Sequence, residues 1–216
     1  MGRFEAVLFD LDGTLLYTLP DMAAALNHAL TGAGYPERTL EEVRGFVGNG
    51  VRRLVRRALP PAADETAAER VYAAYEAFYR RHWRDHTAPY EGIRELLAAL
   101  NDRGIRTGVV TNKTHADAEA IVRSFFGETV RRTEGKTDAR PAKPAPDQAL
   151  AVMSALGTAP ERTLYVGDSA VDAETARNAG TACVLVSWGY REREELEACP
   201  ALAVIDRPEE LLRFVE

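Results

Sequence analysis

The sequence has few cysteines, few lysines and no long apolar run. Its two cysteines, Cys183 and Cys199, belong to no CxxC pair and no Cys/His cluster, which disfavours a zinc site or a disulfide scaffold. No stretch approaches the roughly 18–20 consecutive apolar residues that a membrane-spanning helix needs. We therefore expect a cytoplasmic protein with reduced thiols and no membrane partner.

Basic residues do not outnumber acidic ones. The chain has 27 Lys and Arg against 33 Asp and Glu, a net charge of −6, so a nucleic-acid partner is not favoured. Only Lys113, Lys136 and Lys143 are lysines; the other basic residues are arginines. With 216 residues, 46% of them hydrophobic, the chain can form one large domain, or a medium domain with an insertion, around a substantial core.

Short apolar runs that end at polar residues recur along the chain. They are Ala6–Phe9 before Asp10, Ile105–Val110 before Thr111, Thr163–Val166 before Gly167, and Ala182–Val186 before Ser187. Helical patterns lie between them, which predicts an α/β fold with a Rossmann-like parallel sheet. Ligands bind such sheets at the carboxyl ends of the strands, where these polar residues fall. Residues 129–140 are unusually polar for the strand that this fold needs there.

Residues 17–86 break the alternation because they show helical periodicity only. Thr39 with Glu42 has the pattern of a capping box, and Pro60-Pro61 separates two helical patterns. We therefore expect an α/β core domain built from residues 1–16 and 87–216. An all-helical domain, residues 17–86, is inserted into it.

Two acidic motifs follow predicted strands. Asp10-Leu11-Asp12-Gly13-Thr14 comes after the first strand, and Gly167-Asp168-Ser169-Ala170-Val171-Asp172 after a later one. Buried carboxylates need a cation or hydrogen-bond donors, and an oxygen-rich cluster suits Mg²⁺. Taken alone, the first motif has a structural alternative as a polar turn, and the second as a helix N-cap. Both together, in this order, favour a phosphate-handling site.

With these motifs the chain resembles the haloacid dehalogenase superfamily, and within it the phosphoglycolate phosphatase-like group. The resemblance rests on DLDGTL at 10–15, TNK at 111–113, KPAPD at 143–147 and GDSAVDAETARNAG at 167–180. It implies a Rossmann-like core with an inserted α-helical cap, Mg²⁺ as cofactor and phosphatase chemistry. The chain departs from many relatives at Tyr17-Thr18, where they carry Asp-Ser.

The resemblance also implies roles for the acidic residues. Asp10 would be the nucleophile, and Asp12 the general acid and then the general base. Mg²⁺ would lie between Asp10, the backbone carbonyl of Asp12 and Asp168. Asp172 would orient Lys143 or a metal-bound water.

Phosphate contacts are implied for Thr111, Asn112 and Lys143. Thr111-Asn112 has the alternative of capping the helix that begins near His115. Lys136 is a nearby competitor for the role of Lys143, and Lys113 is assigned equally to the rim of the site or to the surface.

Five residues at or inside the helical insertion are candidates for substrate contact: Tyr17, Gly48, Asn49, Gly50 and Arg52. Tyr17 is as easily explained by packing at the hinge. The arginines between residues 44 and 57 are interpreted as a solvated face, from which one guanidinium could reach a substrate carboxylate or a second phosphate.

Together with the motifs, the resemblance implies a Mg²⁺-dependent phosphatase that acts on a small phosphorylated metabolite through a phosphoaspartyl intermediate. The leading candidate substrate is 2-phosphoglycolate. A phosphomutase of the β-phosphoglucomutase type, a pyrophosphatase or nucleotidase, and a non-catalytic phosphate-sensing module remain as alternatives. The protein is expected to be a monomer or a homodimer.

Overall fold

The chain folds as two compact units. The computed structural model describes residues 4–48 and 50–215. One unit comprises Met1–Leu16 and Pro89–Glu216, and the other Tyr17–Ala88. The smaller unit therefore ends at residue 88, two residues after the expected boundary at residue 86. The chain passes between the units in two short strands, β2 (Leu16–Tyr17) and β3 (Ala88–Pro89), which pair as a two-stranded sheet.

The larger unit is built on a six-stranded parallel sheet, which confirms the predicted fold class. The strand order is β5-β4-β1-β6-β7-β8, and β1 lies between β4 and β6, with Phe9 opposite Val109 and Val166. The strands are β1 (Ala6–Phe9), β4 (Arg106–Thr114), β5 (Arg132–Lys136), β6 (Thr163–Gly167), β7 (Ala182–Val186) and β8 (Ala203–Ile205). All four residues of β1 are buried, as expected for a central strand covered on both faces.

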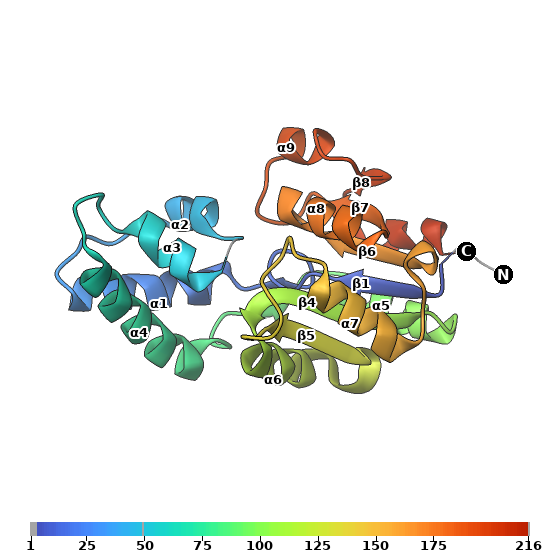
Figure 1. Cartoon of the computed structure of the whole chain (residues 1–216), viewed down its shortest axis with the longest axis horizontal. Helices are drawn as coiled ribbons and strands as arrows, with labels where there is room; N and C mark the ends of the chain where they lie inside the picture. The colour runs from blue at the N-terminus through green and yellow to red at the C-terminus, as the bar shows by residue number, and fades with distance from the viewer. Residues whose placement is uncertain (1–3, 49, 216) are drawn as a thin grey trace. The chain divides into compact units, whose positions relative to one another are not determined.

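Helices cover the two faces of this sheet. In Figure 1, α7 and α8 lie in front of the sheet and α5 behind it. The front layer shares one apolar cluster with the strands, in which Val152 and Ala176 meet Leu8 and Tyr165. The elements of this unit that remain are α5 (Ile93–Asp102), α6 (His115–Phe126), α7 (Asp147–Leu156), α8 (Ala170–Ala179), α9 (Arg193–Glu197) and the 3₁₀ turns η1 (Gly127–Thr129), η2 (Pro160–Arg162) and η3 (Pro208–Phe214).

The unusually polar segment 129–140 does contain the strand that the fold needs, because its residues Arg132–Lys136 form β5. Its Glu134 is fully buried and would be costly alone, but Arg140 lies 3.2 Å away, and Arg132 and His115 are also paired with it. Paired charge therefore replaces the apolar pattern that normally marks such a strand.

Between Tyr17 in β2 and Ala88 in β3, the regular secondary structure of the smaller unit is helical among its described residues. Its helices are α1 (Leu19–Gly32), α2 (Leu40–Phe46), α3 (Val51–Ala58) and α4 (Glu65–His82), and α1 packs along α4. The predicted capping box is confirmed. Thr39 Oγ1 accepts the Glu42 N–H at 3.2 Å, and Glu42 Oε2 accepts the Thr39 N–H at 2.8 Å.

Across the part of the chain that is described, none of the helices has both the length and the apolar character needed to cross a membrane.

Candidate active site

The ends of three neighbouring strands bring the first candidate residues together. Asp10 follows β1, Thr111–Lys113 lie near the carboxyl end of β4, and Asp168 follows β6. Because β4, β1 and β6 are adjacent and parallel, these residues share the carboxyl edge of the sheet. Their common position comes from topology, since Thr111 is 101 residues after Asp10 in the chain and Asp168 is a further 57 residues on.

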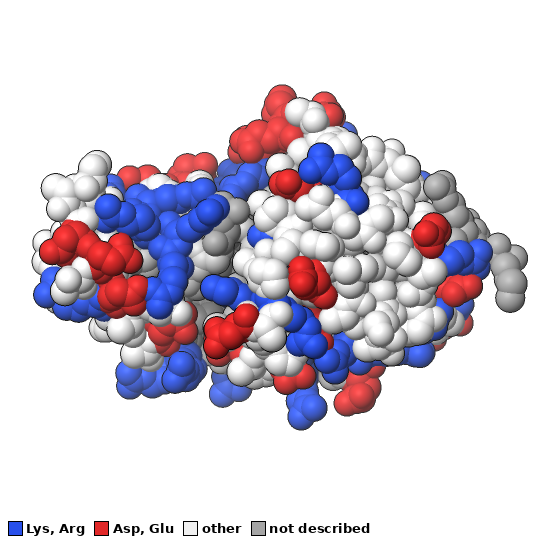
Figure 2. All heavy atoms as spheres, viewed as in Figure 1, with Lys and Arg blue, Asp and Glu red and all other residues white. Residues whose placement is uncertain are grey.

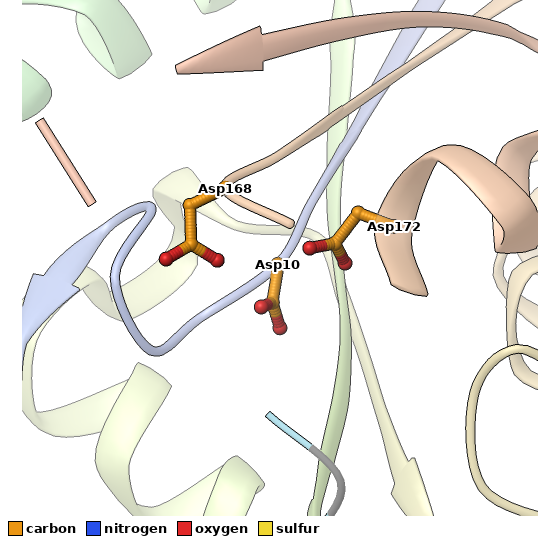
Figure 3. Close-up of side chains that lie close together, drawn as sticks. All are labelled: Asp10, Asp168 and Asp172. Atoms are coloured by element: carbon orange, nitrogen blue, oxygen red, sulfur yellow. The ribbon is translucent and has the colours of Figure 1, made fainter. Parts of the chain in front are cut away.

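Three carboxylates from three segments converge at this edge. One oxygen each from Asp10, Asp168 and Asp172 lies within 4.8 Å of the others, and all three residues are buried. Figure 3 shows Asp10 in the loop after β1, Asp168 after β6, and Asp172 on α8. Three oxygen ligands at this spacing are the donor type that Mg²⁺ prefers.

The ammonium group of Lys143 lies among these carboxylates. Its Nζ is 2.7 Å from Asp10 Oδ1 and 2.7 Å from Asp172 Oδ1. Burial alone would lower the pKa of Lys143, but the two carboxylates outweigh it and hold the pKa well above its ordinary value. Lys143 is therefore a permanent positive charge in the site.

The site nevertheless holds more negative charge than its own residues neutralise. Burial, with Asp172, Asp168 and Asp12 nearby, raises the pKa of Asp10 well above its usual value despite Lys143. Burial and then Asp172 raise the pKa of Asp168 to about 7, although the Tyr190 N–H opposes the shift. A divalent cation would relieve this excess, so the cluster fits Mg²⁺ in charge as well as in donor chemistry.

Asn112 holds the backbone of Lys143. Its Oδ1 accepts the Lys143 N–H at 2.7 Å, and its Nδ2 points to the Lys143 carbonyl at 3.4 Å. The residue expected to touch phosphate thus also fixes the loop that carries the lysine. The competing explanation, that Thr111-Asn112 caps α6, is wrong, because Thr114 is the N-cap and accepts the Asp117 N–H at 3.3 Å.

Asp12 is separate from the three-carboxylate cluster and pairs with Lys113. The Lys113 Nζ lies 3.2 Å from Asp12 Oδ1, and Lys113 is buried. The structure therefore places Lys113 inside the site, and not on the protein surface. Lys136, the other lysine considered for the role of Lys143, is exposed at the end of β5.

Two glycines allow the loops to close around Asp168. A Cβ on Gly13, whose φ is +83°, would lie 2.2 Å from Asp168 Oδ2, and a Cβ on Gly189 would lie 2.3 Å from the Asp168 Cβ. No real side chain tolerates these separations, so both positions require glycine.

The segment after β7 supports the site in a way that the sequence did not predict. Trp188 Nε1 donates to the Thr14 carbonyl at 3.0 Å, and the Tyr190 N–H donates to Asp168 Oδ2 at 2.8 Å. The sequence signal that could have pointed to this support is the run VSWGY at residues 186–190. Ser169 is the N-cap residue of α8, but its hydroxyl donates to Asp172 Oδ2 at 2.5 Å and makes no capping bond to a backbone N–H.

The other expected contacts lie in the helical unit, and their part in substrate binding stays a prediction. Tyr17 belongs to β2, Gly48 follows α2, and Gly50 is the N-cap of α3, while Asn49 lies outside the described residues. Arg52 is on α3, pairs with Glu69 and lies over the Tyr72 ring, 4.2 Å from its centroid.

Basic side chains gather over the region of α2 and α3 in Figure 2. Two of the α3 arginines bind carbonyl groups of their own unit: Arg56 donates to Ala63 at 2.6 Å and Arg57 to Phe46 at 2.9 Å. These contacts give much of the arginine-rich face a structural role.

Comparisons with known proteins agree with this geometry. The haloacid dehalogenase-like hydrolase family matches residues 7–186. The chain is 36% identical to N-acetylmuramic acid 6-phosphate phosphatase of Pseudomonas aeruginosa, over 99% of this chain and 96% of that protein. It is also 36% identical to phosphoglycolate phosphatase of Pseudomonas putida, over 93% of this chain and 75% of that protein.

The fold agrees equally well with a solved structure. The crystal structure of a predicted phosphoglycolate phosphatase from Haemophilus somnus superimposes with a TM-score of 0.91 at 28% identity, covering 99% of this chain and 98% of that one. The motifs, the parallel sheet with its cluster of carboxylates, and these matches point the same way. The chain therefore belongs to the haloacid dehalogenase-like hydrolases, among the phosphoglycolate phosphatase-like enzymes that hydrolyse phosphoric monoesters.

Proposed function

We propose that the protein hydrolyses a small phosphomonoester, with 2-phosphoglycolate as the leading substrate, through a phosphoaspartyl intermediate on Asp10. The observation that carries the proposal is the position of Asp10. Its carboxylate is buried at the sheet edge, 2.7 Å from Lys143 Nζ and clustered with Asp168 and Asp172. A nucleophile there is held beside a cation that can share a phosphoryl oxygen.

The proposed reaction has two steps. In the first, an oxygen of Asp10 forms a bond to phosphorus, the ester P–O bond breaks, and Asp12 gives a proton to the departing oxygen. In the second, water attacks the same phosphorus and gives its proton to Asp12, and the bond to Asp10 breaks to release phosphate. Asp12 suits this shuttle because its carboxylate lies outside the buried cluster.

Asp10, Asp168 and the backbone carbonyl of Asp12 would hold Mg²⁺. When bound, the ion supplies positive charge that lessens the repulsion between a phosphate and the carboxylate that attacks it. Asp172 orients the Lys143 ammonium group through its 2.7 Å contact. Lys143 and Thr111 would then bind the phosphoryl oxygens. The excess negative charge around Asp10 and Asp168 supports this assignment.

The helical unit would serve as the cap that excludes water and selects the leaving group. The names of the relatives support a small phosphorylated metabolite as the substrate, since one is a phosphoglycolate phosphatase and another an N-acetylmuramic acid 6-phosphate phosphatase. A cytoplasmic location and the absence of nucleic-acid and membrane partners belong to the same proposal.

A panel of phosphate esters tests the substrate. Phosphate release with Mg²⁺ would be measured for 2-phosphoglycolate, N-acetylmuramic acid 6-phosphate, β-glucose 1-phosphate, a nucleoside monophosphate and pyrophosphate. We expect the highest kcat/KM for 2-phosphoglycolate. Conversion of β-glucose 1-phosphate to glucose 6-phosphate with little phosphate release would favour a phosphomutase, and no turnover of any compound would reject the proposal.

A further inference from the structure

Lys113 is a buried cation that the hydrolysis described above does not use. It lies near the end of β4, its side chain is only 7% exposed, and its Nζ is 3.2 Å from Asp12 Oδ1. A buried ammonium group is costly and needs a charged partner. Lys143 has a different position, between Asp10 and Asp172, so the two lysines of the site contact different carboxylates.

The position of Lys113 follows from the residue it pairs with. Asp10 faces the phosphorus in the proposed reaction, whereas Asp12 faces the ester oxygen of the leaving group. A cation in contact with Asp12 is therefore on the leaving-group side of the site. In the proposed reaction Lys143 is therefore beside the phosphoryl group, and Lys113 is beside the leaving group.

We propose that Lys113 selects leaving groups that carry a carboxylate one carbon from the ester oxygen. The inference rests on the proposed function, because it takes the role of Asp12 from there. In 2-phosphoglycolate a single methylene separates the carboxylate from that oxygen, so an ammonium group beside Asp12 can bind it. In N-acetylmuramic acid 6-phosphate the carboxylate is on a lactyl ether many bonds from the phosphate ester, beyond the reach of this lysine.

A simpler explanation is that Lys113 only positions Asp12. That role would affect every substrate alike, because every ester must be protonated by the same acid. Selection by charge affects only substrates with the nearby carboxylate. A pair of substrates that differ in this one group separates the two explanations.

The test compares 2-phosphoglycolate with 2-hydroxyethyl phosphate, in which a CH₂OH group replaces the carboxylate. The kcat/KM of both would be measured for the wild type, Lys113→Met and Lys113→Arg in the full chain with Mg²⁺. We expect Lys113→Met to reduce the preference for 2-phosphoglycolate roughly 10–100-fold, the range of a charge-assisted hydrogen bond. Lys113→Arg should retain part of the preference. Lys136→Met, which removes an exposed lysine, should leave it unchanged.

Three outcomes would overturn the inference. An equal loss for both substrates in Lys113→Met would make the lysine a positioning residue for Asp12. A wild type that hydrolyses both substrates equally would show that no carboxylate is selected, while the phosphatase proposal would stand. A wild type that releases phosphate from neither substrate would remove the proposed function itself, together with the inference.

Discussion

Asn112, on β4, fixes the backbone of Lys143, with the Asn112 Oδ1 accepting the Lys143 N–H at 2.7 Å. We expect Asn112→Ala to lower kcat roughly 10–100-fold, because a small displacement of the ammonium group misaligns it with the phosphoryl oxygens. Steady-state kinetics with 2-phosphoglycolate would measure the loss. The melting temperature should change by only a few degrees.

Asn178 supplies the matched control. Its Nδ2 donates to the carbonyl of Pro144, the next residue, at 2.8 Å, but it makes no bond to the Lys143 backbone. Asn178→Ala should therefore reduce kcat less than about 3-fold, within the range of a neutral surface change. If both variants lose activity equally, general loosening of the loop explains the effect, and the specific role of Asn112 is wrong.

Asp10→Asn should abolish turnover, by at least about 10³-fold, because an amide oxygen is a poor nucleophile and cannot form the acyl phosphate. The fold should survive, since the substitution also removes a buried carboxylate whose pKa is raised. Phosphate release and a thermal melt on the same preparation would check both statements. Phosphate release close to that of the wild type would exclude Asp10 as the nucleophile.

Removal of the metal should silence the enzyme without unfolding it. We expect loss of activity in EDTA and its return with Mg²⁺. Saturation with Mg²⁺ at about 100 times its Kd should stabilise the folded state by roughly 2.7 kcal/mol. Thermal melts of the metal-free and Mg²⁺-loaded protein would show the shift, and Asp168→Asn should diminish it. Activity that persists after rigorous removal of metal would contradict the Mg²⁺ assignment.

The raised pKa of Asp168 predicts how the stability of the metal-free protein depends on pH. Burial raises the pKa from 3.8 to about 7, so the folded state binds this proton more tightly than the unfolded state does. Its stabilising contribution is therefore complete below about pH 4 and is lost as the pH rises through about 7. Asp168→Asn should then raise the melting temperature of the metal-free protein at pH 8, by about 2–8 °C.

Melts of the wild type and Asp168→Asn at pH 5 and pH 8, both in EDTA, would measure this difference. The asparagine keeps an oxygen that can accept the Tyr190 N–H, so the comparison isolates the charge. An equal gap at the two pH values would show that Asp168 does not titrate in this range.

Asp21, in the first turn of α1, is hydrogen-bonded to residues 86 and 87 near the end of the helical unit. Its buried Oδ2 accepts the Thr87 N–H and the Thr87 hydroxyl, both at 2.8 Å, and its Oδ1 accepts the His86 N–H at 3.0 Å. We expect Asp21→Ala to lower the free energy of unfolding by about 2–4 kcal/mol, because it leaves buried donors without a partner. Urea denaturation would measure it. Thr87→Val, which removes one of these bonds, should cost about 1 kcal/mol, and equal costs would contradict this account.

Elements with local causes could be predicted from the sequence. The apolar runs at 6–9 and 163–166 end at polar residues, and both are buried strands of the parallel sheet. The helices of the smaller unit follow from their periodicity, and the capping box at Thr39 needs only residues three apart. Asp10, Asp12 and Asp168 could be selected as candidate site residues from the motifs that contain them.

Features that depend on distant residues could not be predicted. β5 is a strand despite its polarity because Glu134 meets Arg140 from a later loop and His115 from α6. Lys113 could be assigned to the site only when its pairing with Asp12, about 100 residues earlier, was known. The support from Trp188 likewise depends on a bond to Thr14, across most of the chain.

The tight packing of Gly13 and Gly189 against Asp168 has a consequence for protein engineering. Any side chain at either position would overlap the Asp168 carboxylate group or its Cβ. Variant libraries meant to broaden the range of accepted substrates should hold both glycines constant. Diversity is better introduced around Lys113, where a change would alter the choice of leaving group and spare the shell that holds the acidic cluster.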